Sequence, residues 1–226
     1  MGTVLITGAS RGIGLEFARQ YAAEGNRVLA TCRAPEKAAE LGALEGEVSV
    51  HRLDVTALPG IEALARALHG EAIDILINNA GMLTSGQRAG GIDFTAWVEE
   101  LKVNTIGPIA VAHAFLPHLR RGTGRRMAFL SSTLASIGEN TSGAYVLYRS
   151  SKAGLNAAVR SLAIDSGADG MIVLLLHPGW VRTDIGGPSA PVAAKDSVRG
   201  MRRVIAAAGP EDSGRFLGFD GREIPW

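Results

Sequence analysis

Residues 4–14 read VLITGASRGIG, and this stretch decides the fold. A short apolar run, Val4–Ile6, leads directly into three glycines, and apolar residues at helical spacing follow from Ile13 to Glu24. A strand, a glycine-rich turn and a helix in this order are typical of a turn that holds a pyrophosphate at the helix N-terminus. The sequence therefore predicts a dinucleotide site at the end of the first strand.

Each glycine of this turn has its own expected purpose. Gly8 permits a tight bend, Gly12 lets the backbone approach the phosphates, and Gly14 lets helix and strand pack closely. Free N–H groups and the partial positive charge of the helix N-terminus favour an anion there. The expected cofactor contacts in this loop are Gly8, Ser10, Arg11, Gly12, Ile13 and Gly14.

The rest of the chain alternates between strand-like and helix-like segments. Strands are expected at residues 28–30, 48–53, 73–77, 127–130, 172–176 and 215–219, and helices at residues 61–68, 94–103, 108–119, 148–164 and 192–207. Strands that are apolar throughout and separated by helices indicate a parallel sheet covered on both faces. No linker or repeat divides the chain, so residues 1–226 are predicted to form one doubly wound α/β (Rossmann) domain.

Composition limits the classes of function. The 226 residues are 46% hydrophobic and 20% charged, and the net charge of +1 favours no partner of one sign. Cys32 is the only cysteine, which rules out an intrachain disulfide. The N-terminus lacks a signal-peptide pattern and the apolar run 171–176 is too short for a membrane span, so a cytoplasmic protein that does not bind membranes is expected.

Two polar clusters have ordinary explanations. The arginines at positions 120, 121, 125 and 126 fit a solvated helix end better than a nucleic-acid surface, because no aromatic residues interleave them. His113 and His118 lie five residues apart, off one helix face, and no carboxylate completes a ligand set. We therefore expect neither a nucleic-acid partner nor a metal.

The end of the second strand indicates which nucleotide binds. NAD sites usually place a carboxylate there to hold the ribose 2′-hydroxyl, but this chain reads Ala30–Arg33. The guanidinium groups of Arg33 and Arg11 instead suit a 2′-phosphate. NADP(H) is therefore predicted over NAD(H). The alternative is that Arg33 is a solvated loop residue.

A phenol and an ammonium stand four residues apart, at Tyr148 and Lys152, near the start of a predicted helix. Residues at this spacing share one helix face. An ammonium near a phenol favours phenolate, and we expect it to lower the pKa of Tyr148 toward neutral pH. The pair predicts acid–base chemistry beside the nucleotide.

With these residues in place, the chain resembles the short-chain dehydrogenase/reductase family from the glycine loop to the C-terminal region. Matching blocks occur in order: residues 7–14, Asp54-Val55, Asn78–Gly81, Asn104, Ser132 with Tyr148 and Lys152, and Pro178-Gly179. Residues 131–138 and 177–184 resemble the subgroup of sniffer-type carbonyl reductases and C-factor-like proteins.

The resemblance implies a role for each matching position. Tyr148 would be the general acid for carbonyl reduction and the base for alcohol oxidation, Lys152 would lower its pKa and bind the nicotinamide ribose, and Ser132 would hold the substrate oxygen. Asn104 would hold a water that links Lys152 to solvent. The implied cofactor contacts continue with Asp54, Val55, Asn79, Ala80, Gly81, Tyr148, Lys152, Pro178, Gly179, Val181 and Thr183.

One spacing departs from many relatives. Ser132 lies sixteen residues before Tyr148 rather than about thirteen, and Ser131 and Ser136 are alternatives. We prefer Ser132 because it directly follows an apolar strand and the subgroup shares the longer spacing. Tyr145 has Arg149 at the fourth position after it and is expected to form a wall of the substrate pocket.

Residues 184–195 are expected to form a short mobile loop over a small, uncharged carbonyl or alcohol substrate. Family resemblance implies a homodimer or homotetramer, with helices 108–119 and 148–164 as the expected contact faces. The predicted activity is NADP(H)-dependent interconversion of a carbonyl and an alcohol. The alternatives are an NADP(H)-binding signalling protein with incidental turnover and a purely structural α/β protein.

Overall fold

The computed structural model describes residues 2–84 and 90–226. Its centre is a seven-stranded sheet in which every neighbouring pair is parallel, in the order β3-β2-β1-β4-β5-β6-β7. The strands are β1 (Thr3–Ile6), β2 (Arg27–Cys32), β3 (Val48–Arg52), β4 (Ile75–Asn78), β5 (Arg126–Leu130), β6 (Ile172–His177) and β7 (Phe216–Gly218). The predicted doubly wound parallel sheet is confirmed.

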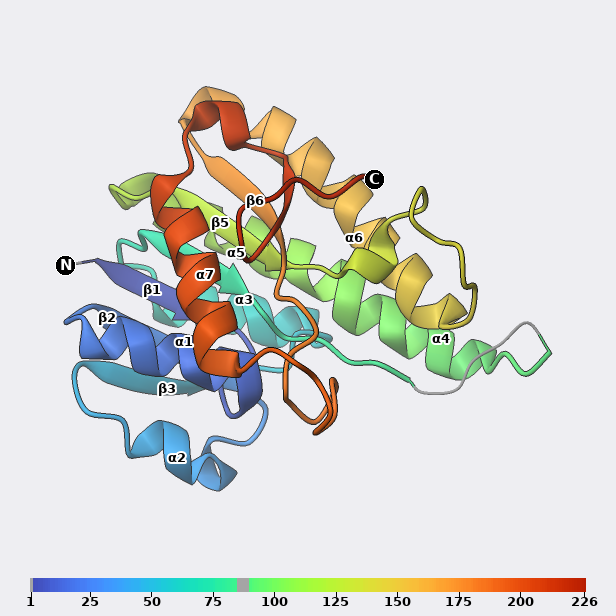
Figure 1. Cartoon of the computed structure of the whole chain (residues 1–226). Helices are drawn as coiled ribbons and strands as arrows, with labels where there is room; N and C mark the ends of the chain where they lie inside the picture. The colour runs from blue at the N-terminus through green and yellow to red at the C-terminus, as the bar shows by residue number, and fades with distance from the viewer. Residues whose placement is uncertain (1, 85–89) are drawn as a thin grey trace.

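Helices cover both faces of the sheet. They are α1 (Gly12–Ala23), α2 (Ala39–Gly42), α3 (Leu58–Ala67), α4 (Phe94–Leu101), α5 (Gly107–Arg121), α6 (Val146–Asp165) and α7 (Ala194–Ala207). Helices α1 and α7 pack together on one face, while α3, α5 and α6 lie on the other (Figure 1). Within the described ranges, no helix has the length and apolar character needed to span a bilayer.

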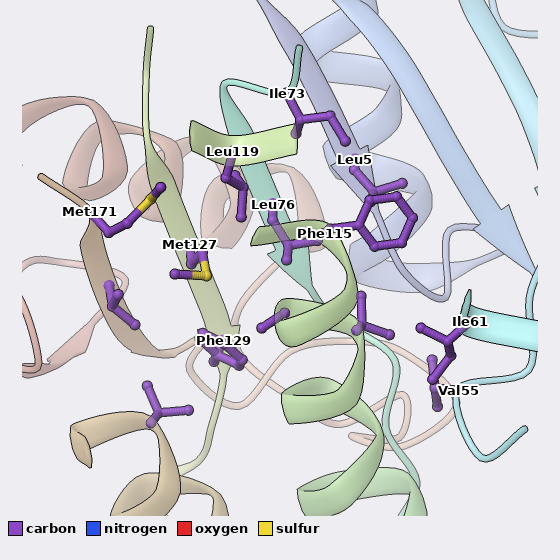
Figure 2. Close-up of a cluster of buried hydrophobic side chains, with 14 of the residues drawn as sticks. Leu5, Val55, Ile61, Ile73, Leu76, Phe115, Leu119, Met127, Phe129 and Met171 are labelled. Carbon is purple, nitrogen blue, oxygen red and sulfur yellow. The ribbon is translucent and has the colours of Figure 1, made fainter. Parts of the chain in front are cut away.

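Two apolar clusters sandwich the sheet, which explains why its strands are apolar throughout. In β1, Leu5 faces one cluster and its neighbours Val4 and Ile6 face the other. Figure 2 shows the first cluster, where Phe115 of α5 lies beside Leu5. Each large apolar side chain buried in this way contributes about 1.5–3 kcal/mol to stability.

The helix boundaries differ from the sequence prediction in one functionally relevant place. Residues 94–103 and 108–119 were expected to form separate helices, but a π-helical turn, Lys102–Ile106, joins α4 to α5. Pro108 has no N–H and so cannot donate to the carbonyl of Asn104 as an α-helix requires. π-Turns inside helices often occur at functional sites.

The order of the strands creates a crevice at the carboxyl ends of β1 and β4. From β1 the chain builds outward through β2 and β3, then returns to place β4 on the other side of β1. Ligands of open α/β sheets bind at such a switch point. The glycine loop after β1 and residues 79–81 after β4 meet there.

Candidate active site

The glycine loop has the backbone that the sequence predicts. Gly8 and Gly12 have φ values of 66° and 57°, which favour glycine. A Cβ atom on Gly14 would lie 2.3 Å from the carbonyl oxygen of Gly8 and 2.5 Å from Nδ2 of Asn79. A side chain is therefore excluded at position 14, and α1 begins without a side-chain cap on its N–H groups.

Asn79 fixes the glycine loop against β4. Its Nδ2 donates to the carbonyls of Thr7 and Gly8, at 2.9 and 3.0 Å. The Thr7 hydroxyl oxygen accepts from the backbone N–H groups of Asn79 and Ala80, at 3.0 and 3.1 Å. The amide of Asn79 is thus used to shape the loop, a structural task that the sequence did not suggest.

The end of β2 carries the predicted cation. Arg33 is exposed, and its charge helps to lower the pKa of Asp54, although hydrogen bonds from Thr56 are the larger cause. Arg52 at the end of β3 donates to the carbonyl of Arg33 at 2.8 Å. This second cation was missed, because only the β2–β3 register, which pairs Cys32 with Arg52, brings it there.

Arg11, the other predicted cation, forms an ion pair with Asp184 at 2.9 Å, and both side chains are more than 70% exposed. The segment after β6 therefore reaches across to the glycine loop. Thr183 lies against Gly12, since a Cβ on that glycine would be 3.4 Å from the Thr183 methyl group.

The expected substrate loop is shorter than predicted and is bonded within itself. Helix α7 starts at Ala194, so Ala194 and Lys195 lie in the helix rather than in a loop ending at 195. Val181 bridges to Val192, and Arg182 donates to the carbonyls of Ala190 and Pro191, each at 2.9 Å. Pro178, whose carbonyl accepts from the Ser197 hydroxyl, starts this segment, and Gly179 follows with a φ of 84°.

Tyr148 and Lys152 lie one turn apart near the start of α6. The Nζ of Lys152 donates to the carbonyl of Leu130 at 2.8 Å and lies 5.9 Å from the centre of the Tyr148 ring. Tyr145, at the N-terminus of the helix, is 41% exposed and has a left-handed backbone. The structure brings the first pair together and leaves Tyr145 at the surface.

The charge states of this pair differ from the sequence expectation. Burial raises the pKa of Tyr148 to about 12, although its side-chain hydrogen bond with Ser132 opposes the rise. Burial also lowers the pKa of Lys152 to about 8. In this structure the pKa of Tyr148 is therefore raised rather than lowered, because burial is the largest cause and the charge of Glu100 acts in the same direction.

The three serines considered for the site have different partners. Ser132 interacts with Tyr148, and its Oγ accepts from the backbone N–H of Leu134 at 3.2 Å. Ser131 donates to Oδ1 of Asn156 at 2.6 Å in the core. Ser136 donates to the carbonyl of Trp226 at 3.2 Å. Ser132 is the serine that interacts with the phenol.

Asn104 lies in the π-helical turn, with its side chain fully engaged. Oδ1 accepts from the N–H of Met82 at 2.9 Å, while Nδ2 donates to the carbonyl of Met82 at 2.8 Å and to Oγ of Ser151 at 3.0 Å. The side chain thus links the segment after β4 to α6. In an α-helix the main-chain carbonyl of Asn104 would accept from the N–H of residue 108, but Pro108 has no N–H to donate.

Two further residues border the site. His177 ends β6, and its Nδ1 accepts from the N–H of Thr133 at 3.3 Å; burial lowers its pKa to about 4, so it is neutral. Glu100 of α4 is fully buried and acts electrostatically on Tyr148 and Lys152. Glu100 was not among the predicted site residues, and its only signal in the sequence is a carboxylate one helical turn before Asn104.

His118 and two arginines of the basic cluster have partners within the fold. His118 is buried and shares a hydrogen bond of 3.1 Å with the carbonyl of Ala65, and no three potential metal ligands meet within residues 2–84 and 90–226. Arg120 pairs with Asp169 at 2.7 Å, and Arg121 donates to the carbonyl of His69 at 2.6 Å. Part of the basic cluster therefore ties neighbouring elements together.

Comparisons with known proteins agree with this geometry. C-signal of Myxococcus xanthus is 47% identical over 154 residues, covering 68% of this chain and 93% of that protein. The carbonyl reductase Sniffer of D. melanogaster superposes with a TM-score of 0.95 at 32% identity, and the NADPH-bound carbonyl reductase from chicken fatty liver with 0.94 at 34% identity. Both alignments cover all of this chain; they cover 100% of Sniffer and 99% of the chicken enzyme.

The family model for short chain dehydrogenases matches residues 2–192, which include the glycine loop, Asn104, Ser132, Tyr148 and Lys152. The expected resemblance is confirmed on sequence and on structure. The chain belongs to the short-chain dehydrogenase/reductase family.

Proposed function

We propose that this chain is an NADP(H)-dependent oxidoreductase that interconverts a carbonyl compound and an alcohol, with Tyr148 as general acid and base. The observation that carries the proposal is the position of Ser132, Tyr148 and Lys152 at the edge of the sheet that also carries the glycine loop. The NADPH-bound carbonyl reductase from chicken fatty liver supports the cofactor.

The residues at the switch point fit a dinucleotide. The turn has no room for a side chain at Gly8 or Gly14, and the uncapped N-terminus of α1 offers N–H groups to a pyrophosphate. Arg33, together with Arg52, would hold the 2′-phosphate. Asp54 and Val55 would lie at the adenine, residues 79–81 at the adenosine, and Thr183 at the nicotinamide amide. Bound NADPH would supply the hydride to the carbonyl carbon.

The raised pKa of Tyr148 suits reduction. A phenol that keeps its proton at neutral pH is ready to donate it to the carbonyl oxygen as negative charge develops. The Ser132 hydroxyl, which forms a hydrogen bond with Tyr148 in this structure, would donate its O–H to the same substrate oxygen when substrate binds. Lys152 would hold the nicotinamide ribose and supply positive charge beside the phenol.

Asn104 would connect Lys152 to solvent through a water. Since its side chain is engaged with Met82 and Ser151, the main-chain carbonyl of Asn104 is the group left to hold that water. Pro108 provides no N–H to compete for this carbonyl. The π-helical turn thus supports the proposed proton path.

We propose a small, uncharged substrate. Arg182 is bonded to carbonyls of its own loop, and Asp184 pairs with Arg11, so the charges of the segment after β6 are already engaged. Trp180 and Ile185 in the same segment are about half exposed and offer apolar contacts.

A signalling role is the second candidate, and the 47% identity to C-signal supports it. In this function the chain binds NADP(H) and its turnover is incidental. An intact set of Ser132, Tyr148, Lys152 and Asn104 favours the enzyme, because a protein that only senses the cofactor does not need a proton donor at the nicotinamide.

A substrate screen tests the proposed activity. Purified protein with NADPH would be offered aldehydes, ketones and diketones, and oxidation followed at the nicotinamide absorbance. Consumption of NADPH that depends on the carbonyl compound is expected. Tight NADPH binding without turnover of any of these classes would favour the signalling candidate.

We also propose a cytoplasmic homodimer or homotetramer that contacts its copies through α5 and α6. The exposed Ile164 of α6 and Ile106 just before α5 support these faces. Analytical ultracentrifugation is expected to show two or four subunits, and a monomer at micromolar concentration would contradict this assembly.

A further inference from the structure

Glu100 is a buried carboxyl that the proposed chemistry does not use. Its exposed fraction is 0%. Oε2 accepts from the backbone N–H of Thr84 at 3.3 Å, whereas Oε1 has no hydrogen-bond partner among residues 2–84 and 90–226. A carboxyl removed from water with one oxygen unpaired is costly unless a cation compensates it.

The fold directs this face of α4 toward the catalytic end of α6. Trp97, one turn before Glu100, donates from Nε1 to Oγ of Ser150 at 2.8 Å. Asn104, one turn after Glu100, donates to Oγ of Ser151 at 3.0 Å. Glu100 therefore lies between two contacts to the residues that immediately precede Lys152.

The backbone of Gly81 shows how close the two elements come. A Cβ on Gly81 would lie 3.3 Å from Oδ1 of Asn104 and 3.6 Å from Nζ of Lys152. Asn104 and the ammonium thus border the same small space, and Glu100 is one helical turn from Asn104. The charge of Lys152 acts on Glu100 and lowers the pKa of its carboxyl.

The effects of burial and charge are reciprocal. Burial lowers the pKa of Lys152, and the charge of Glu100 opposes that shift. Burial raises the pKa of Glu100, and the Thr84 hydrogen bonds and the charge of Lys152 oppose that shift. Glu100 also raises the pKa of Tyr148.

The other charged groups near α4 are directed elsewhere. Glu99 and Lys102 pair with each other at 2.7 Å at the surface, and Arg149 of α6 bonds to Ser142 and the carbonyls of Gly143 and Leu134. Among residues 2–84 and 90–226, Thr84 of the segment after β4 donates to Glu100, and Tyr148 and Lys152 of α6 interact with it electrostatically.

We propose that Glu100 is a positioning residue of this site, whose buried carboxylate is the counter-charge of the Lys152 ammonium. It keeps Lys152 protonated at the sheet edge and disfavours loss of the proton from Tyr148, so it favours the state needed for carbonyl reduction. This role rests on the proposed function for its meaning in catalysis, but the charge pair itself exists without turnover.

The pair can be measured in the protein without cofactor. The chain has four lysines, so a lysine-specific ¹³Cε label gives few NMR signals, and Lys152→Met assigns that of Lys152. Glu100→Gln retains an acceptor for Thr84 but removes the charge. We expect it to lower the titration midpoint of Lys152 by about one pH unit. Glu99→Gln is the matched control and is expected to leave the midpoint unchanged.

An unchanged Lys152 midpoint in a folded Glu100→Gln protein would overturn the proposal. Should that variant fail to fold, the reciprocal titration decides: in Lys152→Met, a ¹³Cδ glutamate label is expected to show the midpoint of Glu100 raised by about one unit. An unchanged titration midpoint of Glu100 in Lys152→Met would also contradict the proposal.

Turnover gives a separate readout. In the reduction direction, Glu100→Gln is expected to move the alkaline fall of kcat to lower pH by the same interval, and Glu99→Gln to follow the wild type. If the wild type turns over no carbonyl compound, the proposed function fails while the NMR titrations still decide on the charge pair.

Discussion

The ammonium of Lys152 donates to the carbonyl of Leu130, the last residue of the strand that leads to Ser132, across 2.8 Å. This bond joins helix α6 to the carboxyl edge of the sheet. Because the ammonium is almost fully buried, the bond compensates only part of its lost hydration, and its pKa falls to about 8.

A stability measurement follows from that shift. Between pH 8 and pH 10.5, the ordinary pKa of a lysine side chain, the unfolded chain holds a proton on Lys152 that the folded chain has released. The free energy of unfolding of the wild type, relative to Lys152→Met, is therefore expected to rise across this window by on the order of 3 kcal/mol. Urea denaturation at several pH values measures it.

The control for this experiment is Lys102→Met, which alters an exposed lysine. Tyr148 titrates above this range in the fold and is common to both proteins, so it cancels in the comparison. If the free energy of unfolding varied with pH in the same way in the wild type and in Lys152→Met, burial would not lower the pKa of Lys152.

The serines of the site are predicted to separate chemistry from stability. Ser132→Ala is expected to lower kcat by about 100-fold, because the substrate oxygen loses a fixed donor. Ser131→Ala is expected to keep turnover but to destabilise the fold by about 1–3 kcal/mol, since Asn156 loses a buried partner. Steady-state kinetics and denaturation check both. The assignment of Ser132 would be wrong if its variant retained full turnover.

The glycine loop is expected to reject a single methyl group at position 14. The new Cβ would lie 2.3 Å from the Gly8 carbonyl oxygen, so Gly14→Ala must displace the loop from Asn79. We expect NADPH affinity to fall more than about 10-fold and stability to fall by about 1–3 kcal/mol. Gly42→Ala is the control, since nothing lies within 4 Å of its Cβ position. Equal NADPH affinities in both variants, measured by calorimetry, would contradict the proposed pyrophosphate site.

Arg33 is predicted to select the phosphorylated cofactor. Arg33→Ala is expected to weaken the binding of NADPH by about 10-fold and to leave the binding of NADH nearly unchanged. The reason is that a charge-assisted hydrogen bond contributes about 1.5–3 kcal/mol. Arg66→Ala, an exposed cation on α3, provides the comparison. The ratio of kcat/KM for the two cofactors measures the effect, and a ratio that favours NADH in the wild type would refute the NADP(H) preference.

The parts of the fold that follow from local pattern were predictable. The apolar strands, the glycine loop and the Tyr148–Lys152 spacing each depend on neighbouring residues, and their places are confirmed. The π-helical turn was not predictable from helical periodicity, although Pro108 explains its presence.

Features that depend on contacts between distant residues could not be predicted from the sequence. Ser131 bonds to Asn156 and Ser136 bonds to the carbonyl of Trp226, which distinguishes both serines from Ser132. Each bond joins residues far apart in the chain, so neither could be predicted from local pattern. Lys152 was expected to lower the pKa of Tyr148, but burial, which the sequence does not display, reverses the direction.

The most direct test of the central claim is Tyr148→Phe beside Tyr145→Phe, with NADPH binding and carbonyl reduction measured on both proteins. Tyr148→Phe is expected to bind NADPH as the wild type does and to lose turnover by at least about 1000-fold. Tyr145→Phe is expected to retain turnover within a few-fold. Wild-type turnover in Tyr148→Phe would contradict the assignment of the phenol as the proton donor and with it the proposed mechanism.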